Sequence, residues 1–458
     1  MTGVRAIVHP GGIEGGRASV PGDKSISHRW LILATTGLGR SELRGLPASL
    51  DVRATASCLA EIAPTEAGVA LEGWASNPAA EANGDRSTTN DPRPRGRGLV
   101  IEGRGRRALH PSKGPLNCAN SGTTMRLLAG VVASTPFETV LQGDPSLTGR
   151  PMERVARPLR AMGAEVSTTD GRAPVAVRGG ALNGIEHRTT VPSAQVKGAV
   201  LLAGVAARGE TTVLEPAATR DHTERGLARL GAPVSFEPGR ATVRAFQHGG
   251  FSAEVPGDVS SAAFLVAAAV LSGKALVIDD VGLNPTRTTF LRVLERMGVA
   301  VRTATGGEEL GEPVGSLEVG PGGALLGTVV GADELPLVID EVPMLALLAA
   351  HATDQTRFEG AAELRVKESD RLAAAVVTLR SLGGGAEIVG DDLIVGGGGL
   401  VGGEVDAHGD HRMAMAAVVS ALAAKGPVSI DGIEAVEVSF PGFVPTMRAL
   451  GARIEVEG

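Results

Sequence analysis

The chain has 458 residues and a formal net charge of −7. This length exceeds what one hydrophobic core supports, so two domains of roughly 200 residues each are expected. The acidic balance and the scarcity of aromatic residues argue against nucleic acid as a partner. The chain has no apolar run of the roughly 18–20 residues that a membrane span needs, and two cysteines are too few for a disulfide framework, so the cytoplasm is the expected location.

The first expected helix begins within Pro21–Arg29, which reads PGDKSISHR. Two β-like segments, Val4–Val8 and Arg17–Val20, precede it, and the apolar run Ser27–Thr36 continues it. Free N–H groups at a helix start, beside cationic and hydroxyl side chains, favour a phosphate or a carboxylate. The side chains in question are Lys24, Ser25 and Arg29, with Asp23 or Ser25 as the cap. The glycine spacing of a P-loop is absent.

An internal repeat runs through the chain. The pattern Leu/Met-x-x-Met/Leu-Gly ends at Gly163, Gly231, Gly298, Gly383 and Gly451, and a strand-like segment follows each glycine. Each glycine is suited to end a helix. A degenerate copy at Cys58–Ile62 is followed by an expected strand at Gly68–Glu72. The pattern predicts six units of βαβαββ type, three per domain.

One segment breaks this rhythm. Residues Ala75–Gly98 are rich in Asn, Asp, Arg, Pro, Ser and Thr and have no apolar period. They are expected to form an exposed insertion between strands at Val69–Glu72 and Leu99–Glu102. Its arginines are interpreted as solvated loop residues.

Polar and charged residues gather immediately before the other apolar helices. A solvated helix face would instead carry charges at helical spacing along its length. The segments are NSGTTMR (120–126), LTGRPM (147–152), PSAQVK (192–197), RDHTE (220–224), PGDVSSAAF (256–264), VIDEVPM (338–344), RVKESDR (365–371) and GDHRMAM (409–415). PGDVSSAAF repeats PGDKS without its lysine and is interpreted as structural.

Seven segments, taken in chain order, resemble the motif set of the 5-enolpyruvylshikimate-3-phosphate synthases (3-phosphoshikimate 1-carboxyvinyltransferases). They are PGDKSISHR, NSGTTMR, LTGRPM, PSAQVK, RDHTE, RVKESDR and GDHRMAM. The resemblance covers the chain apart from residues 75–98. It implies an α/β fold, a two-domain inverted α/β barrel with three βαβαββ units in each domain. One domain would comprise residues 23–256, and the other residues 1–22 with 257–458. Ligands would bind between the domains.

The resemblance also implies a reaction. The family moves the enolpyruvyl group of phosphoenolpyruvate to the 5-hydroxyl of shikimate 3-phosphate and releases phosphate. By position, Asp340 matches the base for the hydroxyl, Glu368 the acid for the methylene carbon, and Lys24 lies near the transferred group. The two carboxyl groups are expected in opposite protonation states. No metal and no cofactor is expected, and the family is usually monomeric.

The substrate-binding residues are carried over by position. Those for shikimate 3-phosphate are Lys24, Ser25, Arg29, Ser193, Gln195, Arg220, Asp340 and Lys367. Those for phosphoenolpyruvate are Lys24, Gly122, Arg150, Gln195, Arg371 and Arg412. Two positions depart from many family members. Ala194 replaces a second serine, whose phosphate contact Lys197 or Arg220 is expected to supply, and Val438 replaces a lysine.

Two other functions stay open at this point. The sister enolpyruvyl transferase that acts on UDP-N-acetylglucosamine shares the fold, but it usually opens with a Lys-Asn pair and uses a loop cysteine. A non-catalytic anion-binding scaffold would not need Asp340 and Glu368 beside the cations. Cys118, His408 and His411 are interpreted as structural, and Arg126 either anchors its helix or touches ligand.

Overall fold

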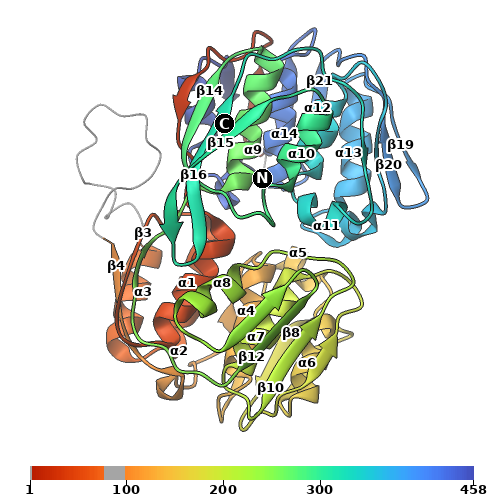
Figure 1. Ribbon diagram of the computed structural model, residues 1–458. Coiled ribbons are helices and arrows are strands. Elements are labelled where there is room, and N and C mark those ends of the chain that lie inside the picture. The colour runs from red at the N-terminus through yellow and green to blue at the C-terminus, as the bar shows by residue number, and fades with distance from the viewer. Residues whose placement is uncertain (1–2, 77–97, 458) are drawn as a thin grey trace.

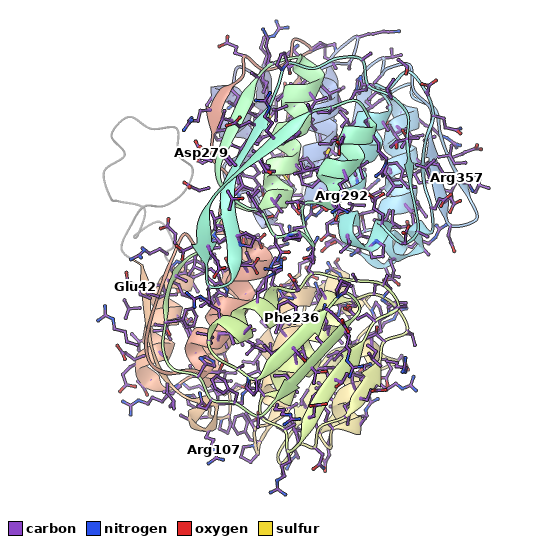
Figure 2. The ribbon with its side chains drawn as sticks, viewed as in Figure 1. Glu42, Arg107, Phe236, Asp279, Arg292 and Arg357 are labelled. Atoms are coloured by element: carbon purple, nitrogen blue, oxygen red, sulfur yellow. The ribbon has the colours of Figure 1, made fainter. Side chains whose placement is uncertain are left out.

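The computed structural model describes residues 3–76 and 98–457. The chain forms two lobes of mixed helix and strand, the lower and the upper lobe of Figure 1. Each lobe has its own hydrophobic core. The lower core contains buried residues between Ile26 and Val255, and the upper core combines residues between Ala6 and Val20 with those between Val259 and Ile454. Arg107 on the lower lobe and Arg357 on the upper lobe point into solvent (Figure 2).

The lower lobe follows the chain from α1 to β13. Its helices are α1 (Lys24–Thr36), α2 (Leu50–Ile62), α3 (Thr65–Ser76), α4 (Gly122–Val132), α5 (Pro145–Thr148), α6 (Glu153–Ala161), α7 (Ala194–Gly204) and α8 (His222–Arg229). Its strands are β3 (Leu38–Arg44), β4 (Leu99–Arg104), β5 (Leu116–Asn117), β6 (Glu138–Gln142), β7 (Glu165–Thr169), β8 (Arg172–Arg178), β9 (Glu186–Arg188), β10 (Glu210–Leu214), β11 (Val234–Glu237), β12 (Arg240–Arg244) and β13 (Ser252–Glu254).

The upper lobe contains both ends of the described chain. Its helices are α9 (Val259–Ser272), α10 (Thr289–Arg296), α11 (Leu335–Val338), α12 (Val342–Ala349), α13 (Arg371–Ser381), α14 (His411–Ala421) and α15 (Phe443–Ala449). Its strands are β1 (Arg5–Val8), β2 (Gly16–Ala18), β14 (Leu276–Gly282), β15 (Val301–Glu309), β16 (Glu312–Val319), β17 (Val329–Val330), β18 (Thr356–Phe358), β19 (Ala386–Val389), β20 (Asp392–Val395), β21 (Gly403–Asp406), β22 (Val428–Asp431) and β23 (Ile454–Glu457).

One strand arrangement recurs in the sheets. The described residues form six sheets, and in five of them a parallel pair is extended by two antiparallel pairings. The order β5-β6-β8-β7 is typical, with β5 parallel to β6 and antiparallel pairs after it. The strands of the N-terminal segment take part in upper sheets, because β1 lies between β22 and β23, and β2 pairs with β14.

The sheet that departs from this arrangement corrects one sequence prediction. It has three strands in the order β13-β3-β4. The predicted strand at Gly68–Glu72 is wrong, because these residues lie within helix α3. Ala67, Leu71, Trp74 and Ala75 are its buried apolar residues, and their spacing is that of one helix face. Residues 77–97 of the predicted insertion lie outside the described residues.

Capped helix starts border the space between the lobes. The Asp23 carboxylate accepts the N–H of Ile26 at 2.9 Å and so caps α1, which makes Asp23 rather than Ser25 the cap. Among the described residues, side chains cap six further helices in the same way: Ser121 (α4), Asp144 (α5), Ser193 (α7), Asp258 (α9), Asp370 (α13) and Asp410 (α14). Arg150 and Pro151 precede α6 rather than opening it, since α6 begins at Glu153.

Candidate active site

A polar cavity of about 160 Å³ lies between the lobes. Of the thirteen residues that the sequence analysis assigns to a site, all within the described part of the chain, twelve line it. They are Lys24, Ser25, Gly122, Arg150, Ser193, Gln195, Arg220, Asp340, Lys367, Glu368, Arg371 and Arg412. Small-molecule pockets usually measure roughly 300–1,000 Å³. The smaller volume here reflects cations and carboxylates that pair across the space.

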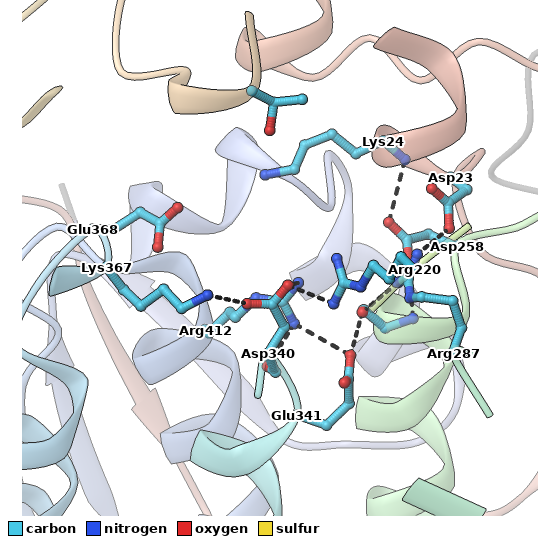
Figure 3. A network of polar contacts seen from close by, with 12 residues as sticks. Asp23, Lys24, Arg220, Asp258, Arg287, Asp340, Glu341, Lys367, Glu368 and Arg412 are labelled. Atoms are coloured by element: carbon cyan, nitrogen blue, oxygen red, sulfur yellow. Dashed lines mark hydrogen bonds and ion pairs between the residues drawn. The ribbon is translucent and has the colours of Figure 1, made fainter. Parts of the chain in front are cut away.

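Lys24 is the first helical residue of α1, and it enters the cavity from the lower lobe. Its Nζ lies 2.9 Å from Asp51 Oδ2 on α2, and both side chains are largely buried. Figure 3 shows Lys24 extending across the cavity toward the side from which Glu368 projects. The cap at Asp23 fixes where α1 starts, so it also fixes where this ammonium group lies.

Four cations surround Asp340, which follows α11. Arg220 Nη2 donates to its Oδ2 at 2.5 Å, and Lys367 Nζ and Arg371 Nη1 lie 3.6 and 3.5 Å from its Oδ1. Arg412 Nη2 lies 3.9 Å from Oδ2. Burial alone would raise the pKa of this carboxyl, but these cations, Arg220 foremost, hold the pKa well below its ordinary value. Asp340 is therefore ionised in the free protein.

Glu368 lies between two arginines at the other side of the cavity. Its Oε2 is 2.7 Å from Arg371 Nη2, and its Oε1 is 3.4 Å from Arg150 Nη1. Burial opposes ionisation, yet Arg371 and Arg150 bring the pKa of Glu368 well below its ordinary value. In the free protein the same excess of positive charge lowers the pKa of both carboxyl groups, so the opposite protonation states expected for the reaction stay a prediction for the substrate complex.

Arg371 supports both carboxylates from the start of α13. It is 1% exposed, and its Nε donates to Asp410 Oδ2 at 2.8 Å. Burial opposes its charge, but Asp410, Glu368 and Asp340 together raise the pKa of Arg371 above its ordinary value. A guanidinium group held by three carboxylates has a fixed position.

Gln195 and Gly122 meet at Arg126, whose role the sequence left open. Arg126 Nη1 donates to Gln195 Oε1, and Gln195 Nε2 donates to Thr123 Oγ1 at 2.9 Å. A Cβ atom on Gly122 would lie 2.8 Å from Arg126 Nη1. Arg126 lines the cavity, so it is a site residue that the sequence analysis did not assign. Its position four residues after Gly122 on α4 was the available signal.

Arg29 is the one predicted site residue that does not line the cavity. It is 3% exposed, and its Nε donates to Thr223 Oγ1 at 2.8 Å. Its Nη1 donates to the carbonyl oxygen of Ser25 at 2.8 Å. Burial lowers the pKa of Arg29 to about 10, so it stays charged behind the start of α1. One helical turn after Ser25, the side chain faces α8 instead of the cavity.

Lys197 is also absent from the cavity lining. Its Nζ lies 2.8 Å from Glu215 Oε2 and 2.9 Å from Glu224 Oε1, and all three side chains are buried. A lysine held in this way is not available to a phosphate at the position of Ala194. Of the two cations expected to compensate for Ala194, the structure brings Arg220 to the cavity.

The structure places the two histidines and the cysteine that the sequence interprets as structural in three different surroundings. His411 borders the cavity, and burial followed by the charge of Lys24 lowers its pKa to about 3, so it is neutral. His408 is exposed and Cys118 is buried. Within the described residues, no group of three His, Cys, Asp or Glu side chains is arranged to hold a metal ion. None of the described helices is both long and apolar enough to cross a membrane.

A two-lobed α/β protein whose cavity combines nine lysine and arginine side chains with a pair of ionised carboxylates belongs to the class of enzymes that act on small anionic substrates. The model of the EPSP synthase (3-phosphoshikimate 1-carboxyvinyltransferase) family matches residues 10–78 and 93–447. The chain belongs to this family.

Relatives and solved structures agree over the full length. The chain is 44% identical to the 3-phosphoshikimate 1-carboxyvinyltransferase of Acidithiobacillus ferrooxidans, over 99% of each chain. It is 45% identical to that of Halorhodospira halophila, over 100% of this chain and 98% of the relative. The EPSP synthase structure from Acinetobacter baumannii has a TM-score of 0.80 and 36% identity, and covers 99% of this chain and 100% of its own.

These findings confirm the predicted family, the mixed α/β fold and the predicted activity. The chain is a transferase of the shikimate pathway, which leads to chorismate and the aromatic amino acids. It moves the enolpyruvyl group of phosphoenolpyruvate to the 5-hydroxyl of shikimate 3-phosphate. The alternative activity on UDP-N-acetylglucosamine is not favoured.

Proposed function

We propose that both substrates bind in the cavity between the lobes, with shikimate 3-phosphate beside Ser193 and Arg220 and phosphoenolpyruvate beside Arg150 and Arg371. Shikimate 3-phosphate contacts Lys24, Ser25, Ser193, Gln195, Arg220, Asp340 and Lys367, with Arg29 supporting Ser25 from behind. Phosphoenolpyruvate contacts Lys24, Gly122, Gln195, Arg150, Arg371 and Arg412. Each substrate carries a phosphate and a carboxylate, which match the arginine heads and the capped helix starts.

The proposed chemistry is an addition followed by an elimination. Asp340 takes the proton of the 5-hydroxyl of shikimate 3-phosphate. The oxygen of this hydroxyl bonds to C2 of phosphoenolpyruvate, and Glu368 gives a proton to C3. In the second step Glu368 removes a proton from the C3 methyl group. The C2=C3 double bond re-forms, and phosphate leaves from C2 with the proton that Asp340 holds. Lys24 stabilises the charge on the transferred group.

Substrate binding prepares Glu368 for this role. In the free protein Arg150 and Arg371 hold its pKa down. When those arginines also pair with the phosphate and carboxylate of phosphoenolpyruvate, less of their charge acts on Glu368, and its pKa rises. Glu368, with two arginines beside it, then takes up a proton, while Asp340, with four cations around it, stays ionised. The carboxyl groups reach opposite protonation states in the complex.

The observation that carries the proposal is the approach of Glu368 and Asp340 to one shared arginine, Arg371, at 2.7 and 3.5 Å. Purified protein should release phosphate from phosphoenolpyruvate when shikimate 3-phosphate is added, and not when UDP-N-acetylglucosamine is added. Asp340→Asn should abolish the release while shikimate 3-phosphate still binds. Unchanged turnover in Asp340→Asn would overturn the assignment of the base.

We also propose the organisation of the chain. Residues 23–256 form one domain, and residues 1–22 together with 257–458 form the other, a division that the two separate cores support. The protein works as a monomer in the cytoplasm. Light scattering on the purified protein tests the monomer, and a dimer that persists at nanomolar concentration would contradict it.

A further inference from the structure

The two chain segments that cross between the lobes carry the same three residues, Pro-Gly-Asp. They are residues 21–23 and 256–258. Asp23 N donates to Pro256 O at 2.7 Å, and Asp258 N donates to Pro21 O at 2.8 Å. Each aspartate caps the helix that follows it, α1 in the lower lobe and α9 in the upper lobe. The crossovers are thus bonded to each other and fix two helix starts.

Arg287 joins both aspartates. It lies in the loop between β14 and α10, and its side chain is 2% exposed. Its Nη1 donates to Asp23 Oδ2 at 2.9 Å, and its Nη2 lies 3.2 Å from Asp258 Oδ1. Burial opposes its charge, but Asp23, Asp258 and Glu341 raise the pKa of Arg287 above its ordinary value. A permanently charged guanidinium therefore ties the crossovers together.

The same guanidinium contacts the lower lobe at α8. Its Nη1 lies 3.3 Å from Nε2 of His222, the first residue of that helix. His222 Nδ1 in turn lies 2.8 Å from Glu312 Oε1 on β16 of the upper lobe. Arg220, two residues before His222, donates to Asp340 at 2.5 Å. One end of the Arg287 network thus reaches the proposed base through the segment before α8.

The other end reaches Asp340 through Glu341. Arg287 Nη2 donates to Ser260 Oγ at 2.7 Å, and Ser260 Oγ donates to Glu341 Oε1. Glu341 is 1% exposed, and its Oε1 lies 3.8 Å from Arg412 Nη1, which donates to the carbonyl oxygen of Asp340 at 2.8 Å. Figure 3 shows this chain of contacts running from Asp23 and Arg287 through Glu341 to Asp340.

We infer that Arg287, acting through Ser260 and Glu341, is a positioning residue that fixes the orientation of Asp340 at the interface of the lobes. The inference rests on the proposed role of Asp340 as the base. Arg287 borders the cavity, but both of its Nη atoms contact protein groups, so its effect on substrate is indirect. A change in this network alters the orientation of the base, and it leaves Arg150 and Arg371 beside phosphoenolpyruvate in place.

Ser260→Ala is the first test, because it breaks the link between Arg287 and Glu341 and keeps every charge. We expect kcat to fall at least tenfold, while KM for phosphoenolpyruvate changes less than threefold and the thermal midpoint changes little. Ser261→Ala is the matched control, since Ser261 is equally buried on α9 and its hydroxyl has no hydrogen bond among the described residues. It should keep full turnover.

Arg287→Lys and Arg287→Met form the second test. Lysine has one ammonium group and cannot hold Asp23, Asp258 and Ser260 with a planar fork, so it should restore only part of the turnover that methionine loses. Arg292→Met, an exposed change on the neighbouring helix α10 (Figure 2), is the control and should leave kcat unchanged. The pH profile of kcat is a further measurement. Its acidic limb reports the pKa of the base, which a purely structural role of Arg287 would leave unchanged.

The outcomes separate this inference from the proposed function. If the unmodified protein releases no phosphate with shikimate 3-phosphate, both fail. Suppose instead that the unmodified protein is active and Asp340→Asn is inactive. If folded Ser260→Ala and Arg287→Lys then keep kcat within twofold, and the acidic limb of their pH profiles does not move, the positioning role alone is wrong. If the Arg287 variants do not fold, Ser260→Ala decides by itself.

Discussion

Glu368→Gln isolates the proton transfer to carbon. Glutamine keeps the size of the side chain but cannot act as a proton donor at C3. General acid catalysis by a positioned side chain contributes about 10²–10⁴-fold, which corresponds to about 2.7–5.5 kcal/mol of transition-state stabilisation. We therefore expect kcat to fall by about 10²–10⁴-fold.

Substrate affinity and stability should respond differently from turnover. Removing the carboxylate 2.7 Å from Arg371 and 3.4 Å from Arg150 frees both cations for phosphoenolpyruvate, so its affinity should stay the same or increase. Arg371 keeps Asp410 at 2.8 Å, so the buried guanidinium does not lose its main partner. The free energy of unfolding should decrease by only about 1–2 kcal/mol.

Two assays measure this variant. Phosphate release gives kcat, and mass spectrometry of residual phosphoenolpyruvate in D₂O, with shikimate 3-phosphate present, reports protonation at C3 through deuterium in the methylene group. Glu363→Gln makes the same chemical change in the same cavity, where Glu363 pairs with Arg154 at 2.9 Å. Its loss of turnover should be at least tenfold smaller. A Glu368→Gln protein with kcat within tenfold of the unmodified enzyme, and with normal deuterium uptake, would refute the assignment.

Three further predictions concern substrate fit, a buried ion group and pH. Gly122→Ala places a Cβ 2.8 Å from Arg126 Nη1, so steady-state kinetics should show a higher KM for phosphoenolpyruvate with an unchanged thermal midpoint. Lys197→Met leaves two buried glutamates without their cation, and urea titration should show a loss of about 3–5 kcal/mol; a loss under 1 kcal/mol would contradict this. His28 and His411 are buried, and burial lowers the pKa of both below the ordinary 6.5, so they stay neutral while the unfolded chain takes up protons. Stability should therefore fall as the pH drops through about 6.5, with a slope that approaches about 1.4 kcal/mol per pH unit for each histidine, and urea midpoints at intervals from pH 7.5 to 5.5 should show a smaller slope for His411→Gln.

Local sequence signals account for much of the fold and of the site. Asp23 and Ser193 precede apolar helices. A capping residue next to a cationic residue predicts an anion-binding helix start from the local sequence alone. The strand predicted at Gly68–Glu72 failed because a short apolar run does not distinguish a strand from a helix. Ala67, Leu71 and Trp74, read over a longer window, have helical spacing.

Cations whose partners are distant in sequence could not be assigned in this way. Lys197 and Arg29 stand at helix starts like true site residues, but tertiary packing turns Lys197 toward Glu215 and Glu224 and turns Arg29 toward Thr223. The contacts of Arg287 come from three separate stretches of chain, and none of them lies next to it in a recognisable motif. Pairing between separate segments of the chain leaves no local pattern.

The position of β1 determines when the upper lobe can be completed during synthesis. This strand is made before the other described strands, whereas its two neighbours, β22 and β23, are made after all of them. The buried residues of the lower core all lie between Ile26 and Val255, so this lobe can fold while translation continues. The first segment must wait unpaired throughout, and a ribosome that stops before β22 leaves an exposed edge ready to pair with another chain.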